Sequence, residues 1–246
     1  MPLQPVDKVW MNGRMVDWKD ATVHVLSHAL HYGTGVFEGI RCYETSRGPA
    51  VFRLRDHMER LHRSGRIFQM DIPYSVDELV DATTELIKTN ELRSCYVRPI
   101  AIRGYGEMGI YCLDAPIDVS IAVWPWGSYL GEEGLLNGVR MTISSWRRHD
   151  PNIIPPTAKV TGAYVNSVAA KIEAVQHGFD EAIMLNPQGY VSEATGENIY
   201  VVKGGEIFTP PLSSGPLEGI TRDSVITIAN DLGMTVKEAQ LSRADL

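Results

Sequence analysis

One lysine stands apart from the other charged residues of this sequence. Lys159 lies in the segment Ile153–Tyr164, which contains apolar and hydroxyl residues but no carboxylate. Apolar surroundings disfavour the ammonium form, so a lysine placed there is a usable amine nucleophile. Pro155 and Pro156 predict an extended approach, so Lys159 is expected near a strand end, ahead of a helix. Read alone, the segment fits more simply a lysine that snorkels from a half-buried strand.

Three other stretches could bind a phosphate or a carboxylate. Gly219–Thr221 is a glycine-led turn entering a helix, where backbone N–H groups and the helix dipole favour a phosphate, although Thr221 would cap the helix in either case. Arg60 could clamp a phosphate bidentately, or it could be an ordinary surface residue. Tyr96 and Arg98 fall on one face of a predicted strand, because side chains alternate, and such a pair suits a carboxylate.

Two glutamates, Glu193 and Glu197, occupy a turn of small residues between predicted strands. One exposed glutamate there would be ordinary, whereas a glutamate facing a protonated pyridine nitrogen would make the ring an electron sink. His24, His28 and His31 do not predict a metal site, because no carboxylate or cysteine completes a known geometry. No serine-hydrolase elbow, P-loop or dinucleotide-binding unit supports those functions.

Composition narrows the class of protein. The net charge of −7, without any basic stripe, argues against a nucleic-acid partner. The opening residues lack a signal-peptide core and no apolar run approaches the length of a membrane span, so the protein is expected to be soluble and cytoplasmic. Cys42, Cys95 and Cys112 are odd in number and lack CxxC spacing, which predicts reduced core thiols.

The first half of the chain predicts an antiparallel sheet with two helices. Asn12-Gly13 tolerates the positive φ angles of a type I′ turn and predicts a hairpin of residues 9–11 and 14–16. Ser75 and Glu78 form a capping box ahead of apolar residues at helical spacing, which predicts a helix there. The other predicted strands cover residues 36–43, 50–54, 95–103 and 117–124, and the other predicted helix covers residues 55–69.

A domain boundary is predicted at residues 126–137, because residues 124–138 contain a proline, four glycines and only a short apolar pair. The N-terminal domain would then cover residues 1–125 and the C-terminal domain residues 138–246. Strands are expected at residues 139–146 and 181–185, and a hairpin around Gly204-Gly205. A helix is predicted over Tyr164–Gln176, with Val165, Val168, Ala169 and Ile172 facing a core. The last helix is predicted to begin at Thr221 as N-cap, with a core face of Val225, Ile228, Ala229 and Leu232.

Five motifs together resemble those of the fold-type IV pyridoxal-phosphate enzymes, and most closely the branched-chain amino acid aminotransferases. They run in order along nearly the whole chain, and any one alone would be a weak signal. The resemblance implies a two-domain α+β fold with an N-terminal α/β sandwich-like domain and a C-terminal pseudo-barrel domain. The motifs are residues 31–41 (HYGTGVFEGIR), 96–99 (YVRP), 156–159 (PTAK), 191–198 (VSEATGEN) and 217–222 (LEGITR).

The resemblance also implies roles for particular residues. Lys159 would hold pyridoxal 5′-phosphate as a Schiff base and carry the proton between the substrate α-carbon and the cofactor. Glu193 would face the pyridine nitrogen and Tyr164 the phenolic oxygen. The remaining cofactor contacts implied are Arg60, Gly219, Ile220 and Thr221 to the phosphate and Leu217 to the ring. The implied substrate contacts are an aromatic pocket of Phe37, Trp126, Tyr129 and Tyr164, space at Gly39, and Tyr96 and Arg98 as carboxylate receivers, including the distal carboxylate of glutamate.

The expected activity is amino-group transfer between branched-chain L-amino acids and 2-oxoglutarate in a ping-pong cycle. The alternatives are a D-amino acid aminotransferase or an aminodeoxychorismate lyase of the same fold, or a truncated, catalytically silent form. The resemblance implies at least a homodimer, in which Tyr32 and the loop near Gly109-Ile110 reach the neighbouring site, and bacterial members often form trimers of dimers. Family chains normally continue several dozen residues past a point like Leu246, so a chain that stops there is expected to lose cofactor on dialysis and to turn over slowly.

Overall fold

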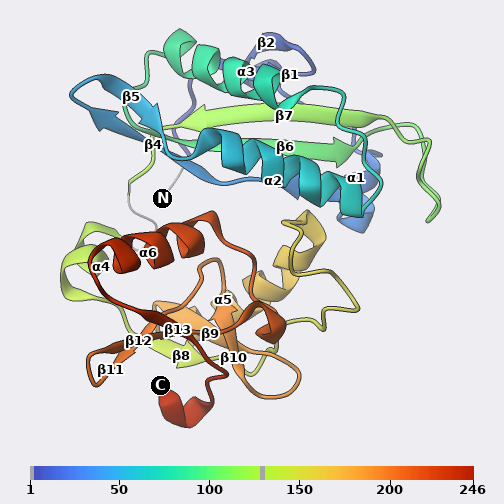
Figure 1. The fold of residues 1–246 in the computed structure, drawn as a ribbon. Coiled ribbons are helices and arrows are strands. Elements are labelled where there is room, and N and C mark those ends of the chain that lie inside the picture. Colours follow the sequence, from blue (N-terminus) through green and yellow to red (C-terminus); the bar gives the residue numbers. More distant parts are fainter. Residues whose placement is uncertain (1–2, 128–130) are drawn as a thin grey trace. The chain divides into compact units, whose positions relative to one another are not determined.

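The structure is a computed structural model that describes residues 3–127 and 131–246. Its fold is α+β, as predicted. The chain divides into two compact units (Figure 1). The first unit is Met1–Gly127 with Ala158–Gly162, and the second is Ser128–Thr157 with Ala163–Leu246. The segment around Lys159, which lies within the predicted C-terminal domain of residues 138–246, therefore belongs to the first unit.

A seven-stranded antiparallel sheet forms the first unit. Its strand order is β2-β1-β7-β6-β4-β5, and β3 also pairs with β6. Helices α2 and α3 pack against each other and against this sheet (Figure 1). The strands are β1 (Lys8–Met11), β2 (Arg14–Asp17), β3 (Gly35–Phe37), β4 (Ile40–Thr45), β5 (Gly48–Val51), β6 (Cys95–Arg103) and β7 (Ile117–Trp124), and the helical segments are η1 (Trp18–Asp20), α1 (His28–Tyr32), α2 (Leu54–Ile67) and α3 (Val76–Thr89).

Local signals placed most of these elements correctly. Asn12 and Gly13 have φ angles of 48° and 87° and join β1 to β2 as predicted. Ser75 and Glu78 form the predicted capping box of α3. Strands β6 and β7 have the predicted bounds, whereas the strand predicted over residues 50–54 is shifted to β5 (Gly48–Val51), which pairs with β4. Cys42 and Cys95 are buried free thiols, whereas Cys112 is only half-buried.

The predicted single strand over residues 36–43 was wrong, because Glu38 and Gly39 interrupt it between β3 and β4. Both strands still pair with β6 in one register, in which Phe37 lies opposite Ile100 and Ile40 opposite Val97. Pro99 of β6 lies opposite the break. Its carbonyl accepts from the N–H of Glu38, but a proline has no N–H to return the second ladder bond. The break therefore follows from Pro99.

Two small sheets and three helices form the described part of the second unit. One sheet has the order β10-β9-β8 and the other β11-β12-β13, and each combines an antiparallel pair with a parallel pair. The predicted strand over residues 139–146 is reduced to β8. The strands are β8 (Met141–Ile143), β9 (Glu181–Leu185), β10 (Val191–Ala194), β11 (Val201–Lys203), β12 (Glu206–Thr209) and β13 (Val236–Glu238), and the helical segments are α4 (Gly131–Asn137), α5 (Tyr164–Gln176), η3 (Leu212–Ser214), α6 (Ile220–Asp231) and η4 (Arg243–Asp245). The short helix η2 (Thr161–Ala163) lies where the chain passes from the first unit to the second.

Helix α5 has the predicted bounds, but the predicted core face was wrong. Val165 is 73% exposed, and Val168 and Ile172 are also exposed. The buried side carries small residues instead, namely Ser167, Ala170 and Ala174. Ala170 and Ala174 pack in one cluster with Ala182 and Met184 of β9. Small residues allow the helix to lie close to the strand, which an apolar periodicity cannot reveal.

Helix α6 differs from its prediction at its start and along its face. Gly219, not Thr221, is the N-cap, since its backbone is extended and its carbonyl accepts from the N–H of Asp223. Of the predicted core face only Ala229 is buried, while Ile228 and Leu232 are exposed.

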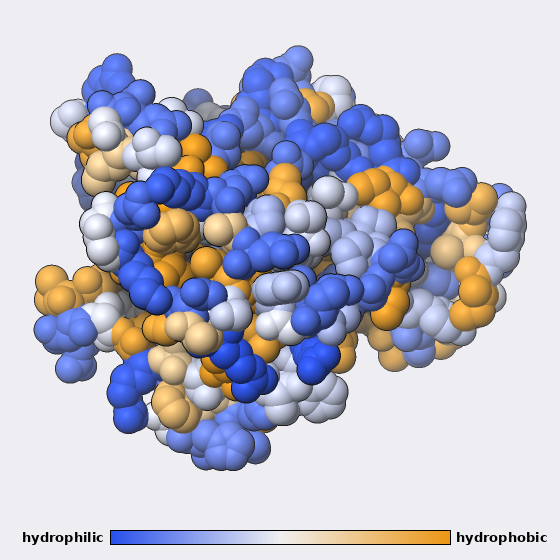
Figure 2. All heavy atoms as spheres, turned by 60° about the horizontal axis from the view of Figure 1, so that its bottom comes forward, coloured by the Kyte–Doolittle hydropathy of each residue, from blue (hydrophilic) through white to orange (hydrophobic). Residues whose placement is uncertain are grey.

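Helix α4 lies inside the predicted linker. The face in Figure 2 likewise shows hydrophobic residues interspersed with hydrophilic ones. Among the described residues, no helix combines the length and apolarity needed to cross a membrane.

Candidate cofactor and active site

The backbone around Lys159 is fixed against β3 and α2. The Lys159 N–H donates to the Ser64 hydroxyl at 3.0 Å, and its carbonyl accepts from the Phe37 N–H at 3.1 Å. Val160 then forms a β-bridge with Val36. The chain continues into η2 and α5, so Lys159 precedes a helix, as predicted. These bonds use backbone atoms of Lys159, so they do not depend on its side chain.

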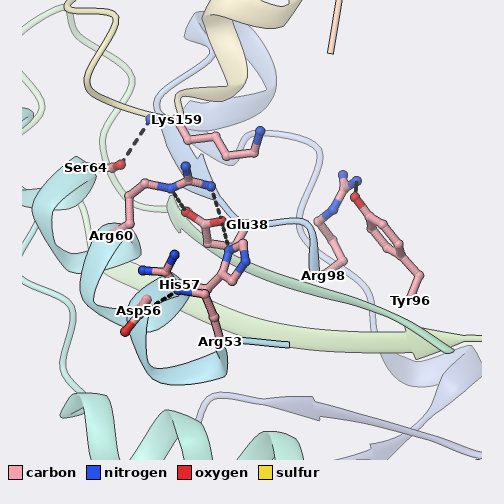
Figure 3. Close-up of polar contacts among 9 residues, drawn as sticks. All are labelled: Glu38, Arg53, Asp56, His57, Arg60, Ser64, Tyr96, Arg98 and Lys159. Carbon is pink, nitrogen blue, oxygen red and sulfur yellow. Dashed lines mark hydrogen bonds and ion pairs between the residues drawn. The ribbon is translucent and has the colours of Figure 1, made fainter. Parts of the chain in front are cut away.

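The Lys159 side chain lies over an aromatic ring that also contacts an arginine. Its Nζ is 5.0 Å from the centroid of Phe37, and Cζ of Arg98 is 4.8 Å from the same centroid. Figure 3 shows Lys159 and the Arg98–Tyr96 pair side by side above the sheet. The structure thus brings together three of the predicted residues, Lys159, Phe37 and Arg98, on the first unit. Cations over an aromatic face are attracted by its negative quadrupole, which favours this arrangement.

Tyr96 and Arg98 share one face of β6, as the alternation predicted, and the Arg98 guanidinium donates to the Tyr96 hydroxyl at 3.4 Å. The Tyr96 ring also meets Trp126, with centroids 4.4 Å apart. A Cβ on Gly39 would lie 2.1 Å from the Tyr96 hydroxyl oxygen, so only glycine fits beside this tyrosine. Arg98 and Trp126 also line an open cavity of about 650 Å³, which lies within the size range of ligand pockets. Phe37, Gly39 and Lys159 are not in its lining.

Arg60 is buried on α2 and belongs to a carboxylate cluster that the sequence did not predict. Its Nε and Nη2 donate to the two oxygens of Glu38, both at 2.7 Å, and His57 Nδ1 lies 2.7 Å from Glu38 Oε2 (Figure 3). Burial raises the pKa of Glu38, but the hydrogen bonds and charges of Arg60 and His57 outweigh it and hold that pKa at about 2. Glu38 is therefore an anion at neutral pH.

The described contacts of Tyr32 are to Met108 and His28, and they do not include Lys159, Phe37 or Arg98. It is 45% exposed, its hydroxyl donates to the Met108 carbonyl at 3.2 Å, and its ring stacks on His28. The His28 ring in turn lies 3.0 Å from the carbonyl of Gly109 through Nε2. Tyr32 and the predicted loop near Gly109-Ile110 thus lie together on the surface. Tyr129, the remaining predicted substrate contact, falls outside the described residues.

In the second unit, Glu193 joins two motifs that are far apart in the sequence. Its carboxylate accepts from the Leu217 N–H at 3.1 Å and from the Asn198 side-chain amide at 3.4 Å, and it pairs with Arg148 Nη2 at 2.7 Å. A Cβ on Gly219 would lie 1.8 Å from Asn198 Oδ1, so the turn before α6 requires glycine there. Arg148 is itself buried, so this ion pair is largely shielded from solvent.

The two glutamates predicted in one turn differ in their surroundings, and the structure places Glu193 in β10 rather than in a turn. Burial, and secondly the negative charge of Glu181, raise the pKa of Glu197 to about 7. Glu197 is therefore about half neutral at pH 7, whereas Glu193 has Arg148 beside it.

The remaining predicted cofactor residues lie at two helix starts of the second unit. Tyr164 is the first residue of α5, and Ile220 and Thr221 form the first turn of α6. Backbone N–H groups of a first helical turn point along the helix axis and favour an anion. Each unit thus carries groups of the kind that pyridoxal 5′-phosphate needs: an amine and a buried arginine in the first unit, and a buried carboxylate and a helix start in the second.

Comparison with known proteins identifies the family of this chain. The family model described as amino-transferase class IV matches residues 35–246. The branched-chain-amino-acid aminotransferase of Escherichia coli (strain K12) is 49% identical over 250 residues, which cover 100% of this chain and 80% of the relative. The chain therefore belongs to the class IV aminotransferase family, and within it to the branched-chain-amino-acid aminotransferases.

Solved structures show the same fold. The crystal structure of the Escherichia coli branched-chain amino acid aminotransferase superposes with a TM-score of 0.96 at 50% identity, covering 98% of this chain and 80% of that one. The T.th. enzyme of the same name has been solved complexed with N-(5′-phosphopyridoxyl)-L-glutamate, with a TM-score of 0.93, 47% identity, and coverage of 99% of this chain and 80% of that one. It has also been solved with 4-methylvaleric acid, with a TM-score of 0.92, 46% identity and the same two coverages.

Proposed function

We infer that this protein transfers the amino group of branched-chain L-amino acids to 2-oxoglutarate, with pyridoxal 5′-phosphate as its cofactor. The observation that carries this conclusion is the alignment of the whole chain with the Escherichia coli branched-chain-amino-acid aminotransferase at 49% identity. The T.th. relative binds both a phosphopyridoxyl adduct of glutamate and 4-methylvaleric acid, a branched carboxylic acid. Glutamate and a branched aliphatic acid are what the two halves of such a transfer require.

Bound pyridoxal 5′-phosphate supplies an electron sink for the negative charge that develops at the substrate α-carbon. The residues of this chain supply the rest. Lys159 provides the amine that holds the cofactor, and it takes and returns the proton at the substrate α-carbon. Glu193 holds a proton at the pyridine nitrogen, and Arg148 pairs with the Glu193 carboxylate. The other proposed contacts are Tyr164 to the phenolic oxygen, Leu217 to the ring, and Arg60, Gly219, Ile220 and Thr221 to the phosphate.

A screen of L- and D-amino acids with 2-oxoglutarate tests this function. L-Leucine, L-isoleucine and L-valine are expected to be used in preference to their D-forms and to other L-amino acids. Phe37, Trp126 and Tyr96 supply an aromatic wall that suits an aliphatic side chain. Turnover of D-amino acids alone would identify a D-amino acid aminotransferase instead, and a protein that binds no cofactor would exclude transamination altogether.

Arg98 is expected to distinguish the two half-reactions. Glutamate brings a distal carboxylate into the pocket that also accepts the leucine side chain, and Arg98 beside Tyr96 can bind that carboxylate. Arg98→Ala should weaken the glutamate half-reaction by roughly 2 kcal/mol or more, because a charge-assisted hydrogen bond is lost, and should affect the leucine half-reaction less. Single-turnover kinetics with each amino acid compare the two. Arg93→Ala, which removes an exposed arginine paired with Glu44, is the matched control; equal losses in Arg98→Ala would show that Arg98 binds the shared α-carboxylate.

We also propose that at least two copies assemble. Leu30 and Tyr32 of α1 are exposed, and so are Ile110 and Tyr111 of the adjoining loop, at 81% and 74%. Such a cluster of exposed apolar residues is typical of an interaction surface. The same surface contains Tyr32 and the loop that the family resemblance assigns to the neighbouring site. Sedimentation velocity should give a dimer or a multiple of it, and a monomer that is fully active would contradict the proposal.

A further inference from the structure

Helix α2 carries a stripe of three buried polar side chains, of which the function proposed above gives a role to Arg60 alone. His57, Arg60 and Ser64 lie at positions i, i+3 and i+7, on one face of the helix, and none is more than 6% exposed. Buried polar groups cost free energy unless they are hydrogen-bonded. Each of the three has a partner in the first unit: His57 and Arg60 meet Glu38, and Ser64 accepts the N–H of Lys159.

Glu38 is 0% exposed, and both of its carboxylate oxygens accept hydrogen bonds from Arg60 (Figure 3). Because the carboxylate is ionised it can only accept hydrogen bonds, so His57 Nδ1 must carry the hydrogen and donate it. A side-on pair of this kind fixes the plane of the guanidinium as well as its position. It occupies two of the five N–H donors of Arg60, and the plane so fixed sets the direction of the others.

We propose that Glu38 is a positioning residue that sets the Arg60 guanidinium for the cofactor phosphate. The inference rests on the proposed function, in which Arg60 binds that phosphate. Glu38 occupies the break between β3 and β4, opposite Pro99, and its carboxylate meets His57 and Arg60 of α2. Ser64, one turn after Arg60, holds the Lys159 backbone. One rigid helix therefore aligns the phosphate-binding guanidinium with the segment that carries the amine.

Fold stability alone is a poor explanation for this cluster. Replacing a buried ion pair by well-packed apolar residues is often neutral or stabilising, because the desolvation cost of the charges is removed. What an apolar replacement cannot supply is a fixed guanidinium plane. A misplacement of about 1 Å at a binding group can cost about 100-fold, so orientation is a sufficient reason to retain the pair.

The substitution Glu38→Gln disturbs the orientation in a defined way. Each carboxylate oxygen accepts from one nitrogen of Arg60, so an amide placed there in either orientation turns its NH₂ group toward an Arg60 donor. One of the two bonds must break. Loss of the Glu38 negative charge would by itself strengthen phosphate binding, because the carboxylate no longer repels the phosphate. The charge effect therefore predicts tighter binding, whereas the loss of orientation predicts weaker binding.

The test compares pyridoxal 5′-phosphate with pyridoxal, which lacks the phosphate. Their dissociation constants are measured by equilibrium dialysis on protein stripped of its cofactor, for the wild type, Glu38→Gln, Arg60→Gln and the double variant. Glu38→Gln is expected to weaken binding of the phosphate ester about tenfold more than binding of pyridoxal. The double variant should show no further loss beyond Arg60→Gln, because Glu38 acts through Arg60. Both ligands report on the same folded protein, so partial unfolding cannot produce the change in ratio.

Asp56→Asn is the matched control, since it removes a carboxylate from the Arg53–Asp56 pair at the start of the same helix, and the ratio should stay at the wild-type value. Glu38→Asp is a second variant that keeps the charge but shortens the side chain, and it should shift the ratio in the same direction as Glu38→Gln. If Arg60→Gln weakens binding of the phosphate ester but Glu38→Gln leaves the ratio unchanged, the inference about Glu38 is overturned and the proposed function stands. Tighter binding of the phosphate ester by Glu38→Gln has the same meaning. An unchanged ratio in Arg60→Gln overturns both the phosphate role of Arg60 and this inference, and a wild type that binds neither ligand overturns the proposed function.

Discussion

Replacing Lys159 by alanine is expected to reduce transamination on the order of 10⁴-fold, since it removes the amine and the proton-transfer group together. The segment should stay in place, because its hydrogen bonds to Ser64 and Phe37 use backbone atoms of Lys159. Steady-state assays with L-leucine and 2-oxoglutarate measure the loss. Thermal unfolding of the same samples should show a midpoint close to that of the wild type.

Peptide mapping gives an independent test of Lys159 as the lysine that holds the cofactor. Borohydride reduction of the cofactor-loaded protein should place the pyridoxyl mass on the peptide that contains Lys159. Lys203→Ala is the matched control, since Lys203 is an exposed lysine of β11 and its loss should leave activity unchanged. A pyridoxyl mass on Lys171 or Lys203 would exclude Lys159 as the cofactor lysine.

The sequence predicted the elements whose signals are local. An Asn-Gly turn, a capping box and unbroken β-rich runs depend on neighbouring residues, and the structure has the β1–β2 hairpin, α3, β6 and β7 where these signals put them. Where long-range packing decides, the same reasoning failed. The apolar periodicity of α5 selected valines that are exposed, because close packing against β9 needs Ala170 and Ala174. The N-cap of α6 was placed at Thr221 by residue preference, whereas close approach to Asn198 requires Gly219 there.

In the candidate site, too, residues with a signal in the sequence were predicted, and residues that depend on distant partners were missed. Motif resemblance identified Lys159, Arg98 and Glu193, which the structure then places in charged or aromatic clusters within their units. It did not identify Glu38 or Arg148, because the partners of these residues are distant in sequence. Glu38 lies inside the motif of residues 31–41, and its position beside Gly39 and opposite a proline was the available signal. A proline in a central strand removes a ladder bond and marks where the opposite strand can break.

Glu193 is the second residue for which we expect a large effect. Glu193→Gln should retain the cofactor but lose about 10²-fold or more in turnover, because a neutral amide cannot hold the pyridine nitrogen protonated. The amide would also turn a donor toward either Arg148 Nη2 or the Leu217 N–H, which both donate to the carboxylate. Cofactor content by absorbance and turnover with L-leucine, measured on one sample, separate loss of binding from loss of chemistry.

Glu197→Gln is the matched comparison, because Glu197 lies four residues after Glu193, just beyond β10. Burial and the charge of Glu181 raise its pKa to about 7, so the carboxyl is already about half neutral at pH 7 and the amide changes little. Its turnover should fall far less than that of Glu193→Gln. As the pH rises above 7 the Glu197 carboxyl ionises, so any difference between wild type and Glu197→Gln should grow toward alkaline pH. Ordinary turnover in Glu193→Gln together with a large loss in Glu197→Gln would transfer the ring-nitrogen role to Glu197.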